Sequence, residues 1–248
     1  MKLYVSQNNL SNQTVSLIWL VFLALAFACN SQVKKEQIAQ EKSQDEPSRH
    51  SFEHLPPSPV AGQARIIFFG NSITAGYGLN ADKAFPALIQ QKISELGLNS
   101  FRVVNAGNSG ETTAGGKNRV EWVILHGVDI FVLELGGNDG LRGIKTEETY
   151  QNLSEIIDIV RKKNAEAIIL LAGMQVPPNL GEEYTTSFKK IYPKLAKEKN
   201  VRLIPFILQG VGGNPEYNLS DKIHPNEQGH KIIADNVWKY LRSYLIIG

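Results

Sequence analysis

The sequence predicts an α/β fold, in which a parallel β-sheet is covered by helices on both faces. Between residues 60 and 248, short apolar runs that are typical of buried strands alternate with longer segments of helical periodicity. Within the segment 147–163, Leu153, Ile156, Ile157 and Val160 recur at i, i+3, i+4 and i+7, which places them on one helix face. This part of the chain is long enough for one domain with a sizeable core.

Strand and helix patterns follow one another regularly along this domain. The predicted strands are residues 65–69, 101–105, 130–135, 167–171 and 202–204. The predicted helices are residues 84–96, 116–125, 147–163, 184–199 and 226–245. Because helices separate the strands, we expect the strands to run parallel.

A serine directly follows the first predicted strand. In open parallel sheets, ligands bind at the carboxyl ends of the strands. Ser72 at such a strand-to-helix turn would expose its hydroxyl and a backbone N–H, the first as a nucleophile and the second as an oxyanion donor. We expect Gly70 to allow strained backbone angles and Gly76 to keep the next segment loose. The alternative is that Ser72 only caps the following helix.

Three further loops are expected at the same edge of the sheet. Residues 105–112 follow the second strand and contain two glycines, which let backbone N–H groups approach a ligand. Asn138 follows the third strand and offers a side-chain amide. Asp221 precedes His224 by three positions in the loop before the last helix, where it can hydrogen-bond the imidazole and fix its tautomer. Each loop alone is also ordinary turn or helix-capping chemistry.

Taken in this order, the features resemble the SGNH (GDSL-like) hydrolase family. Four blocks of sequence are similar to its bacterial multifunctional acyl-CoA thioesterase, lysophospholipase and arylesterase subgroup. They are Val-Asn-Ala at 104–106 with Ser-Gly-Glu-Thr at 109–112, Leu-Glu-Leu-Gly-Gly-Asn-Asp-Gly-Leu-Arg-Gly at 133–143, Ile-Tyr-Pro-Lys-Leu-Ala-Lys-Glu at 191–198 and Ile-His-Pro-Asn at 223–226. The likeness extends over the whole predicted domain.

This resemblance implies a serine ester hydrolase with a flavodoxin-like, three-layer α/β/α sandwich, acting on a small acyl ester. It implies that Ser72 is the nucleophile, that His224 is the general base and that Asp221 orients His224. It further implies an oxyanion hole formed by the backbone N–H groups of Ser72 and Gly110 and the side-chain amide of Asn138. No cofactor and no metal is implied.

Two departures from the family pattern limit what is carried over. The family usually has Asp directly before the serine, where this chain has Asn71. Asn can form the same hydrogen bonds as Asp but lacks its charge. We therefore expect activity to survive, whereas the pH dependence of that activity is left open. The loop 176–181 looks shorter than in the thioesterase and lacks the Arg-Leu pair before the proline. A preference for long acyl chains is therefore not carried over.

Two other functions remain open from the sequence. One is a carbohydrate O-deacetylase of the same family, and the other is a non-catalytic surface binding module, because a fold alone does not determine function. The complete set of five site residues favours an enzyme. The balance of 26 Lys and Arg residues against 24 Asp and Glu residues gives no electrostatic reason to expect a nucleic-acid partner.

Residues 1–28 are predicted to be a secretory signal peptide. The apolar run at 15–27 is shorter than the roughly twenty residues of a membrane span, and a small-x-small pattern ends at Ala28. Cys29, the only cysteine, follows directly and resembles a bacterial lipoprotein processing site, so it is the predicted lipidation site. The alternatives are an uncleaved membrane anchor and ordinary cleavage after Ala28.

Residues 29–60 are predicted to be a flexible polar tether, and residues 61–248 are the predicted hydrolase domain. The tether is rich in charged residues and proline and contains too little apolar surface to fold. Such a segment suits a domain held away from a membrane. We therefore expect an exported lipoprotein that faces the periplasm or cell surface, or else a soluble periplasmic or secreted protein.

Overall fold

Five parallel strands form one sheet at the centre of the part of the chain that the computed structural model describes, residues 62–245. The strand order is β2-β1-β3-β4-β5, and all pairs are parallel. The five strands confirm the prediction, with bounds that move by at most two residues. They are β1 (Ala64–Gly70), β2 (Phe101–Gly107), β3 (Ile130–Glu134), β4 (Ile168–Ala172) and β5 (Arg202–Ile204).

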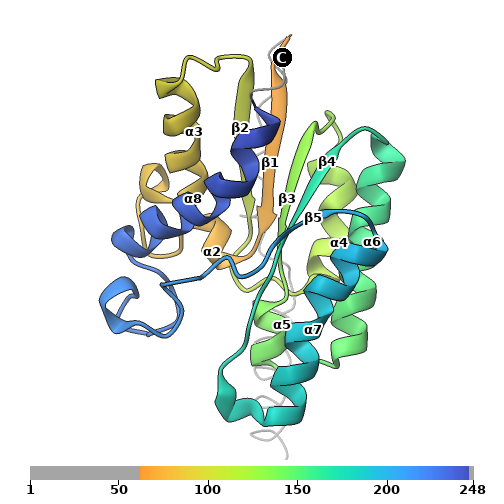
Figure 1. Cartoon of the computed structure of the whole chain (residues 1–248), viewed down its shortest axis with the longest axis vertical. Coiled ribbons are helices and arrows are strands. Elements are labelled where there is room, and N and C mark those ends of the chain that lie inside the picture. Colours follow the sequence, from red (N-terminus) through yellow and green to blue (C-terminus); the bar gives the residue numbers. More distant parts are fainter. Residues whose placement is uncertain (1–61, 246–248) are drawn as a thin grey trace, which may run out of the picture. The chain divides into compact units, whose positions relative to one another are not determined.

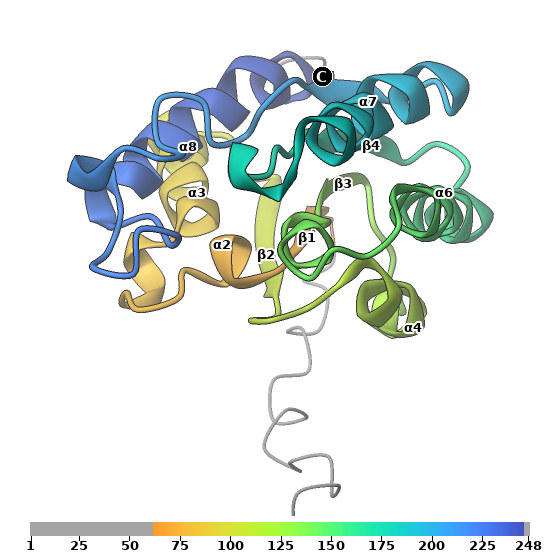
Figure 2. The same ribbon diagram turned by 90° about the horizontal axis from the view of Figure 1, so that it is seen from below.

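Helices cover both faces of this sheet (Figure 1). On one face lie α3 (Phe85–Glu95) and α8 (Glu227–Leu241). On the other lie α4 (Thr113–Val123), α6 (Thr146–Lys163) and α7 (Glu182–Glu198), as the view along the sheet in Figure 2 shows. The arrangement is the predicted three-layer α/β/α sandwich.

The core lies between the sheet and these helices. Every residue of β3 is buried, as are all residues of β1 except the first, because central parallel strands are covered on both faces. The predicted apolar stripe of α6 is also buried, which confirms the helical periodicity of that segment. Its buried residues are Thr149, Leu153, Ile156, Ile157 and Val160.

The register of the central strands determines where the site is built. Gly70 at the end of β1 lies opposite Gly107 of β2 on one side and opposite Glu134 of β3 on the other. β1 lies between β2 and β3, the two strands that follow it in the chain. The chain therefore continues from β1 to β2 on one side and returns across it to β3 on the other. This is a topological switch point, where loops diverge and open a binding crevice.

Several helix bounds differ from the prediction. The helix predicted at 116–125 begins earlier, at Thr113, because the side chain of Thr112 caps it by accepting from the Gly115 N–H. The helix predicted to reach residue 245 ends at Leu241, and a 3-10 turn (Arg242–Tyr244) follows. Two short helices were not predicted: α2 (Ser72–Ala75) and α5 (Gly137–Leu141).

The predicted signal peptide at 1–28, Cys29 and the predicted tether at 29–60 lie outside the described residues. Among residues 62–245, no helix combines the length and apolar character needed to cross a membrane.

Candidate active site

The turn after β1 presents Ser72 at the carboxyl edge of the sheet. Asn71 is the N-cap of α2, and its Oδ1 accepts from the Ile73 N–H at 2.9 Å. Ser72 is therefore the first residue of the helix, and capping is not its role. Its side chain is largely buried, yet its hydroxyl has a partner from a distant loop, described below.

Glycine at the ends of β1 and β2 makes room for this turn. A Cβ at Gly70 would lie 2.6 Å from Glu134 Oε2 and closer still to the Thr74 hydroxyl. A Cβ at Gly107 would overlap the backbone of Ala75. The expectation that Gly70 adopts strained angles is wrong, because its φ is not positive, and space is what it provides. Gly76, with φ of +79°, ends α2 in the left-handed region.

Ser72, His224 and Asp221 form one hydrogen-bonded chain. Ser72 Oγ lies 2.9 Å from His224 Nε2, and His224 Nδ1 lies 2.7 Å from Asp221 Oδ2. Hydrogen bonds from the backbone and ring of His224, and from the Ile223 N–H, lower the pKa of Asp221 to about 2. An ionised carboxylate accepts a hydrogen bond from Nδ1–H, so Nε2 presents its lone pair to the serine hydroxyl.

The loop that carries His224 is held at both ends. Upstream, the Leu219 N–H donates to the His224 carbonyl at 2.7 Å. Downstream, Asn226 caps α8 by accepting from the N–H groups of Gln228 and Gly229. The ring of Tyr77, from the segment after α2, lies against the His224 ring with a centroid distance of 4.4 Å.

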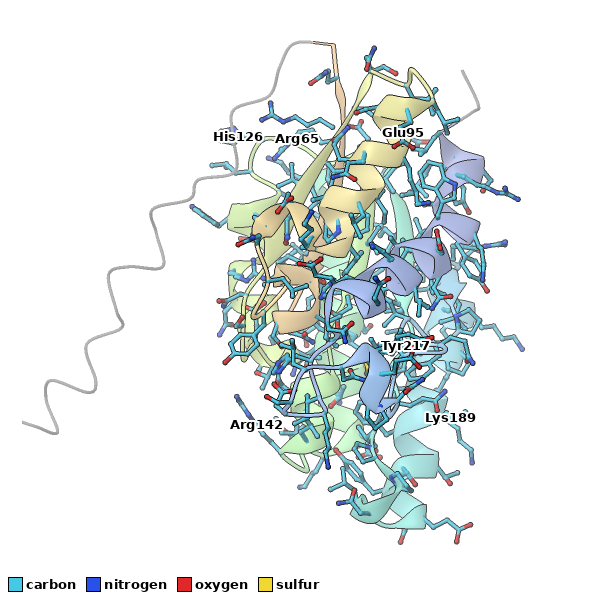
Figure 3. The ribbon with its side chains drawn as sticks, turned by 90° about the vertical axis from the view of Figure 1, so that its left-hand side faces the viewer. Arg65, Glu95, His126, Arg142, Lys189 and Tyr217 are labelled. Carbon is cyan, nitrogen blue, oxygen red and sulfur yellow. The ribbon has the colours of Figure 1, made fainter. Side chains whose placement is uncertain are left out.

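The two predicted oxyanion donors beyond Ser72 come from neighbouring loops. Asn138 is the second residue of α5, and its Nδ2 donates to the Glu111 carbonyl at 2.9 Å. That bond uses one of the two N–H donors of the amide. Gly110, the residue before Glu111, has φ of +80°, and its carbonyl accepts from Arg142 at 3.0 Å. Arg142 lies at the opposite end of the domain from Arg65 and Glu95 (Figure 3).

An arginine that sequence reasoning missed fixes the loop after β2. Arg119 donates to both carboxylate oxygens of Glu111 at 2.6 Å and to the Ala106 carbonyl at 2.8 Å. Its guanidinium lies over the Phe69 ring, 4.2 Å from the centroid. Glu111 is buried, so this two-pronged ion pair is shielded from water and geometrically specific.

Glu134 is a second functional candidate that the sequence analysis missed. It ends β3 beneath the Ser72 turn and is 1% exposed. Burial raises the pKa of Glu134 to about 7, although hydrogen bonds from Thr74 and Asn71 oppose that shift. The sequence does contain a feature that points to Glu134, namely a glutamate at the end of an otherwise apolar strand. A charge buried there needs hydrogen-bonding partners.

An apolar cavity of about 350 Å³ opens beside the site. Four of its lining residues are direct neighbours of predicted site residues, namely Ile73, Gly137, Lys222 and Ile223. The cavity volume lies at the small end of the range for ligand pockets. Val176, Pro177 and Pro178, from the loop that looks shorter than in the thioesterase, contribute to its lining. Apolar side chains from elsewhere also line it, namely Leu141, Met174, Phe206 and Leu208, together with the polar Gln175 and Lys222.

Comparison with known proteins identifies the family of this chain. The family model for GDSL-like lipases and acylhydrolases matches residues 68–232. The chain is 37% identical to "Esterase TesA" of Pseudomonas aeruginosa over 186 residues, which is 75% of this chain and 91% of that protein. It is 40% identical to "Thioesterase 1/protease 1/lysophospholipase L1" of Escherichia coli (strain K12) over 184 residues, 74% of this chain and 86% of that protein.

Structural comparison gives the same result. The crystal structure of TesA matches with a TM-score of 0.69 at 37% identity, covering 73% of this chain and 99% of that one. The resemblance found in the sequence is thereby confirmed. Since the family model spans more than half of the chain and the relatives are similar along most of their length, the chain belongs to the GDSL-like lipase/acylhydrolase family.

Proposed function

We propose that this protein hydrolyses small acyl esters through an acyl-enzyme formed on Ser72. The observation that carries the proposal is the chain from Ser72 Oγ to His224 Nε2 and from His224 Nδ1 to Asp221, at 2.9 and 2.7 Å. This is the arrangement by which a base activates a serine and a carboxylate orients that base. The family and its esterase and thioesterase members support ester hydrolysis as the reaction class.

In the first half-reaction, His224 takes the hydroxyl proton as Ser72 Oγ forms a bond to the acyl carbon. The carbonyl electron pair moves to oxygen, and we assign its stabilisation to the N–H groups of Ser72 and Gly110 and the Asn138 amide. Collapse of this intermediate breaks the bond to the leaving alcohol or thiol, which takes the proton from His224. Asp221 stays ionised throughout, in keeping with its low pKa.

In the second half-reaction, water replaces the leaving group. His224 removes a proton from water as its oxygen attacks the acyl carbon. The second tetrahedral intermediate expels Ser72 Oγ, which takes the proton back from His224, and the free acid leaves. We place the acyl chain in the apolar cavity, because that cavity begins at Ile73, next to Ser72.

Two measurements test this proposal. Turnover of p-nitrophenyl esters of increasing chain length, of acyl-CoA and of acetyl-xylan defines the substrate class, and we expect the short and medium p-nitrophenyl esters to react best. Hydrolysis of acetyl-xylan alone would favour the carbohydrate deacetylase instead. Mass spectrometry after treatment with an organophosphonate should locate one adduct, on Ser72, and an unlabelled Ser72 would contradict the assignment.

We further propose that the enzyme is exported and carries lipid on Cys29. The support is in the sequence: an apolar run that ends on small residues directly before the only cysteine, followed by a polar tether. One lipid chain binds a membrane weakly, whereas several hold a protein firmly. Such an anchor would keep the ester hydrolase at a membrane facing the periplasm or the cell surface.

A further inference from the structure

A buried carboxylate lies under the nucleophile turn and receives all of its hydrogen bonds from that turn. Asn71 Nδ2 donates to Glu134 Oε1 at 2.9 Å. The Asn71 N–H and the Thr74 hydroxyl both donate to Oε2, at 3.3 and 2.7 Å. These donors stand on either side of Ser72 in the sequence, so the carboxylate fixes the backbone from which the serine projects.

Asn71 faces two partners with opposite needs. Its Oδ1 accepts from the Ile73 N–H while its Nδ2 donates to Glu134. An amide meets both needs without gaining or losing a proton. The absence of a side chain at Gly70 completes the arrangement, because a Cβ there would occupy the space in which the Thr74 hydroxyl meets the carboxylate.

We propose that Glu134 is a positioning residue whose ionised carboxylate holds the Ser72 turn in its reactive geometry, and that Asn71 is the amide matched to that charge. The proposal rests on the proposed function of Ser72. An Asp at 71 would set two carboxyl groups against each other, and one of them would have to hold a proton.

Protonation of Glu134 disturbs this arrangement. Three donors already point at the two oxygens, so an added proton makes one oxygen a donor and breaks or reverses a bond. The pKa of Glu134, raised by burial to about 7, places that change near neutral pH. We therefore expect protonation of Glu134 to contribute to the acid limb of activity.

Other charged or titratable groups surround the carboxylate without bonding to it. They are Tyr192 from α7 and Arg119 from α4. The Tyr192 hydroxyl donates to the Leu135 carbonyl, and Arg119 donates to the Gly70 carbonyl and to Glu111. Among the described residues, the carboxylate bonds only to Asn71 and Thr74. Asn71 is thus the partner whose side-chain amide can be replaced by a carboxylate of similar shape.

The test exchanges the carboxylate at position 134 and the amide at position 71, first one at a time and then together. Glu134→Gln sets an amide against an amide, so one of the three bonds is lost in either orientation of the Gln side chain. We expect kcat/KM to fall about ten- to a hundred-fold, and the acid limb of the pH profile to lose the contribution of Glu134. Asn71→Asp sets two carboxylates together, and its activity should fall most at alkaline pH, where neither keeps a proton.

The double variant Asn71→Asp with Glu134→Gln restores one carboxylate and one amide in the reverse order. The new Asp can accept from Ile73 N–H and from the Gln amide, while the Gln oxygen accepts from the two remaining donors. We expect kcat/KM on the alkaline plateau to return to within about three-fold of wild type, less than the loss of one buried bond. Glu95→Gln is the matched control, because Glu95 is exposed and lies at the opposite end of the domain from Arg142 (Figure 3).

Unfolding measurements keep the test independent of turnover. In a Ser72→Ala background, the free energy of unfolding is measured by chemical denaturation for four proteins: the parent, the two single variants at positions 71 and 134, and the double variant. We expect the double variant to be more stable than the sum of the two single effects predicts, which is positive coupling in the double-mutant cycle. Single variants with wild-type pH profiles, or a double variant no better than the poorer single variant, would overturn the inference. If wild type neither hydrolyses esters nor reacts with the phosphonate, the proposed function fails, and the unfolding cycle still decides the pairing.

Discussion

The ring of Tyr77 lies against the imidazole of His224, with centroids 4.4 Å apart and planes inclined at 38°. About half of the Tyr77 side chain remains exposed, at 51%. The ring therefore covers one face of the imidazole at the mouth of the site and limits its rotation away from Ser72.

Tyr77→Ala is expected to lower kcat by up to about ten-fold, the scale of one aromatic pair contact. Tyr77→Phe keeps the ring and should stay near wild type. Steady-state kinetics with p-nitrophenyl acetate separate the two variants. If Tyr77→Ala raises only KM, the ring contacts substrate and does not position His224.

Asn138→Ala is expected to reduce kcat by roughly a hundred- to a thousand-fold, as for the loss of one oxyanion donor. In the structure, one N–H of the Asn138 amide is bonded to the Glu111 carbonyl, which orients the group. Asn138→Asp is the matched variant of similar shape that replaces the donor by a carboxylate, and it should be at least as impaired. A change in KM with kcat preserved would assign Asn138 to substrate binding.

Removing Asp221 should slow the enzyme less than removing His224. In the proposed mechanism, Asp221 orients the imidazole, whereas His224 transfers the proton. We expect losses of several orders of magnitude for His224→Ala and a smaller loss for Asp221→Ala. The pKa of Asp221, about 2, keeps that carboxylate charged down to strongly acidic pH. Equal rates for His224→Ala and wild type would disprove the role of His224 as base.

The sheet and the long helices could be predicted because their apolar spacing is a local property of the sequence. Residues 202–204 and the buried stripe of α6 match the prediction residue by residue. The helices α2 and α5 could not be predicted in this way, because four or five residues are too few for a 3.6-residue period to show. Both nonetheless carry site residues.

The candidate site residues were predicted from their order along the chain, whereas the residues that support them were not. Asn71 and Glu134 are 63 positions apart and meet only because β1 and β3 pair in one register. The ion pair between Glu111 and Arg119 joins a loop to a helix across eight positions. In the sequence, each of these two residues alone is typical of an ordinary surface charge. Such pairings depend on the folded topology and leave no local pattern.

Cys29→Ser tests the proposed anchor, which lies outside the described residues. If Cys29 carries lipid, the substitution should move the enzyme from the membrane fraction to the soluble fraction without changing ester hydrolysis. Mass spectrometry of the mature N-terminus identifies the lipid directly. A protein that begins with unmodified Cys29 would instead indicate ordinary cleavage after Ala28. A chain that starts near Val60 should turn over p-nitrophenyl esters as well as the mature protein.

His230 provides a prediction about stability that is separate from catalysis. It is fully buried on α8, its Nδ1 accepts from the Phe85 N–H at 3.1 Å, and its Nε2 has no hydrogen-bond partner among residues 62–245. Burial lowers the pKa of His230 from 6.5 to about 4, so the folded protein holds the ring neutral. The unfolded chain binds the proton first, and stability is therefore lost as the pH falls from 6.5 towards 4.

The expected loss is about 3 kcal/mol across that window, from a shift of about 2.5 pKa units at 1.36 kcal/mol each. Glu134 acts in the opposite direction: its pKa, raised to about 7, lets the folded protein hold a proton that the unfolded chain has released, so its share of stability grows on acidification. The pH dependence of wild-type stability alone would contain both contributions, that of His230 and that of Glu134.

The variant His230→Gln separates the two contributions, because Gln can still accept from the Phe85 N–H but does not titrate. The unfolding free energy of wild type minus that of His230→Gln, measured by denaturation at several pH values, should fall by about 3 kcal/mol between pH 7 and pH 4. A difference that stays constant with pH would show that His230 does not titrate differently in the folded and unfolded protein.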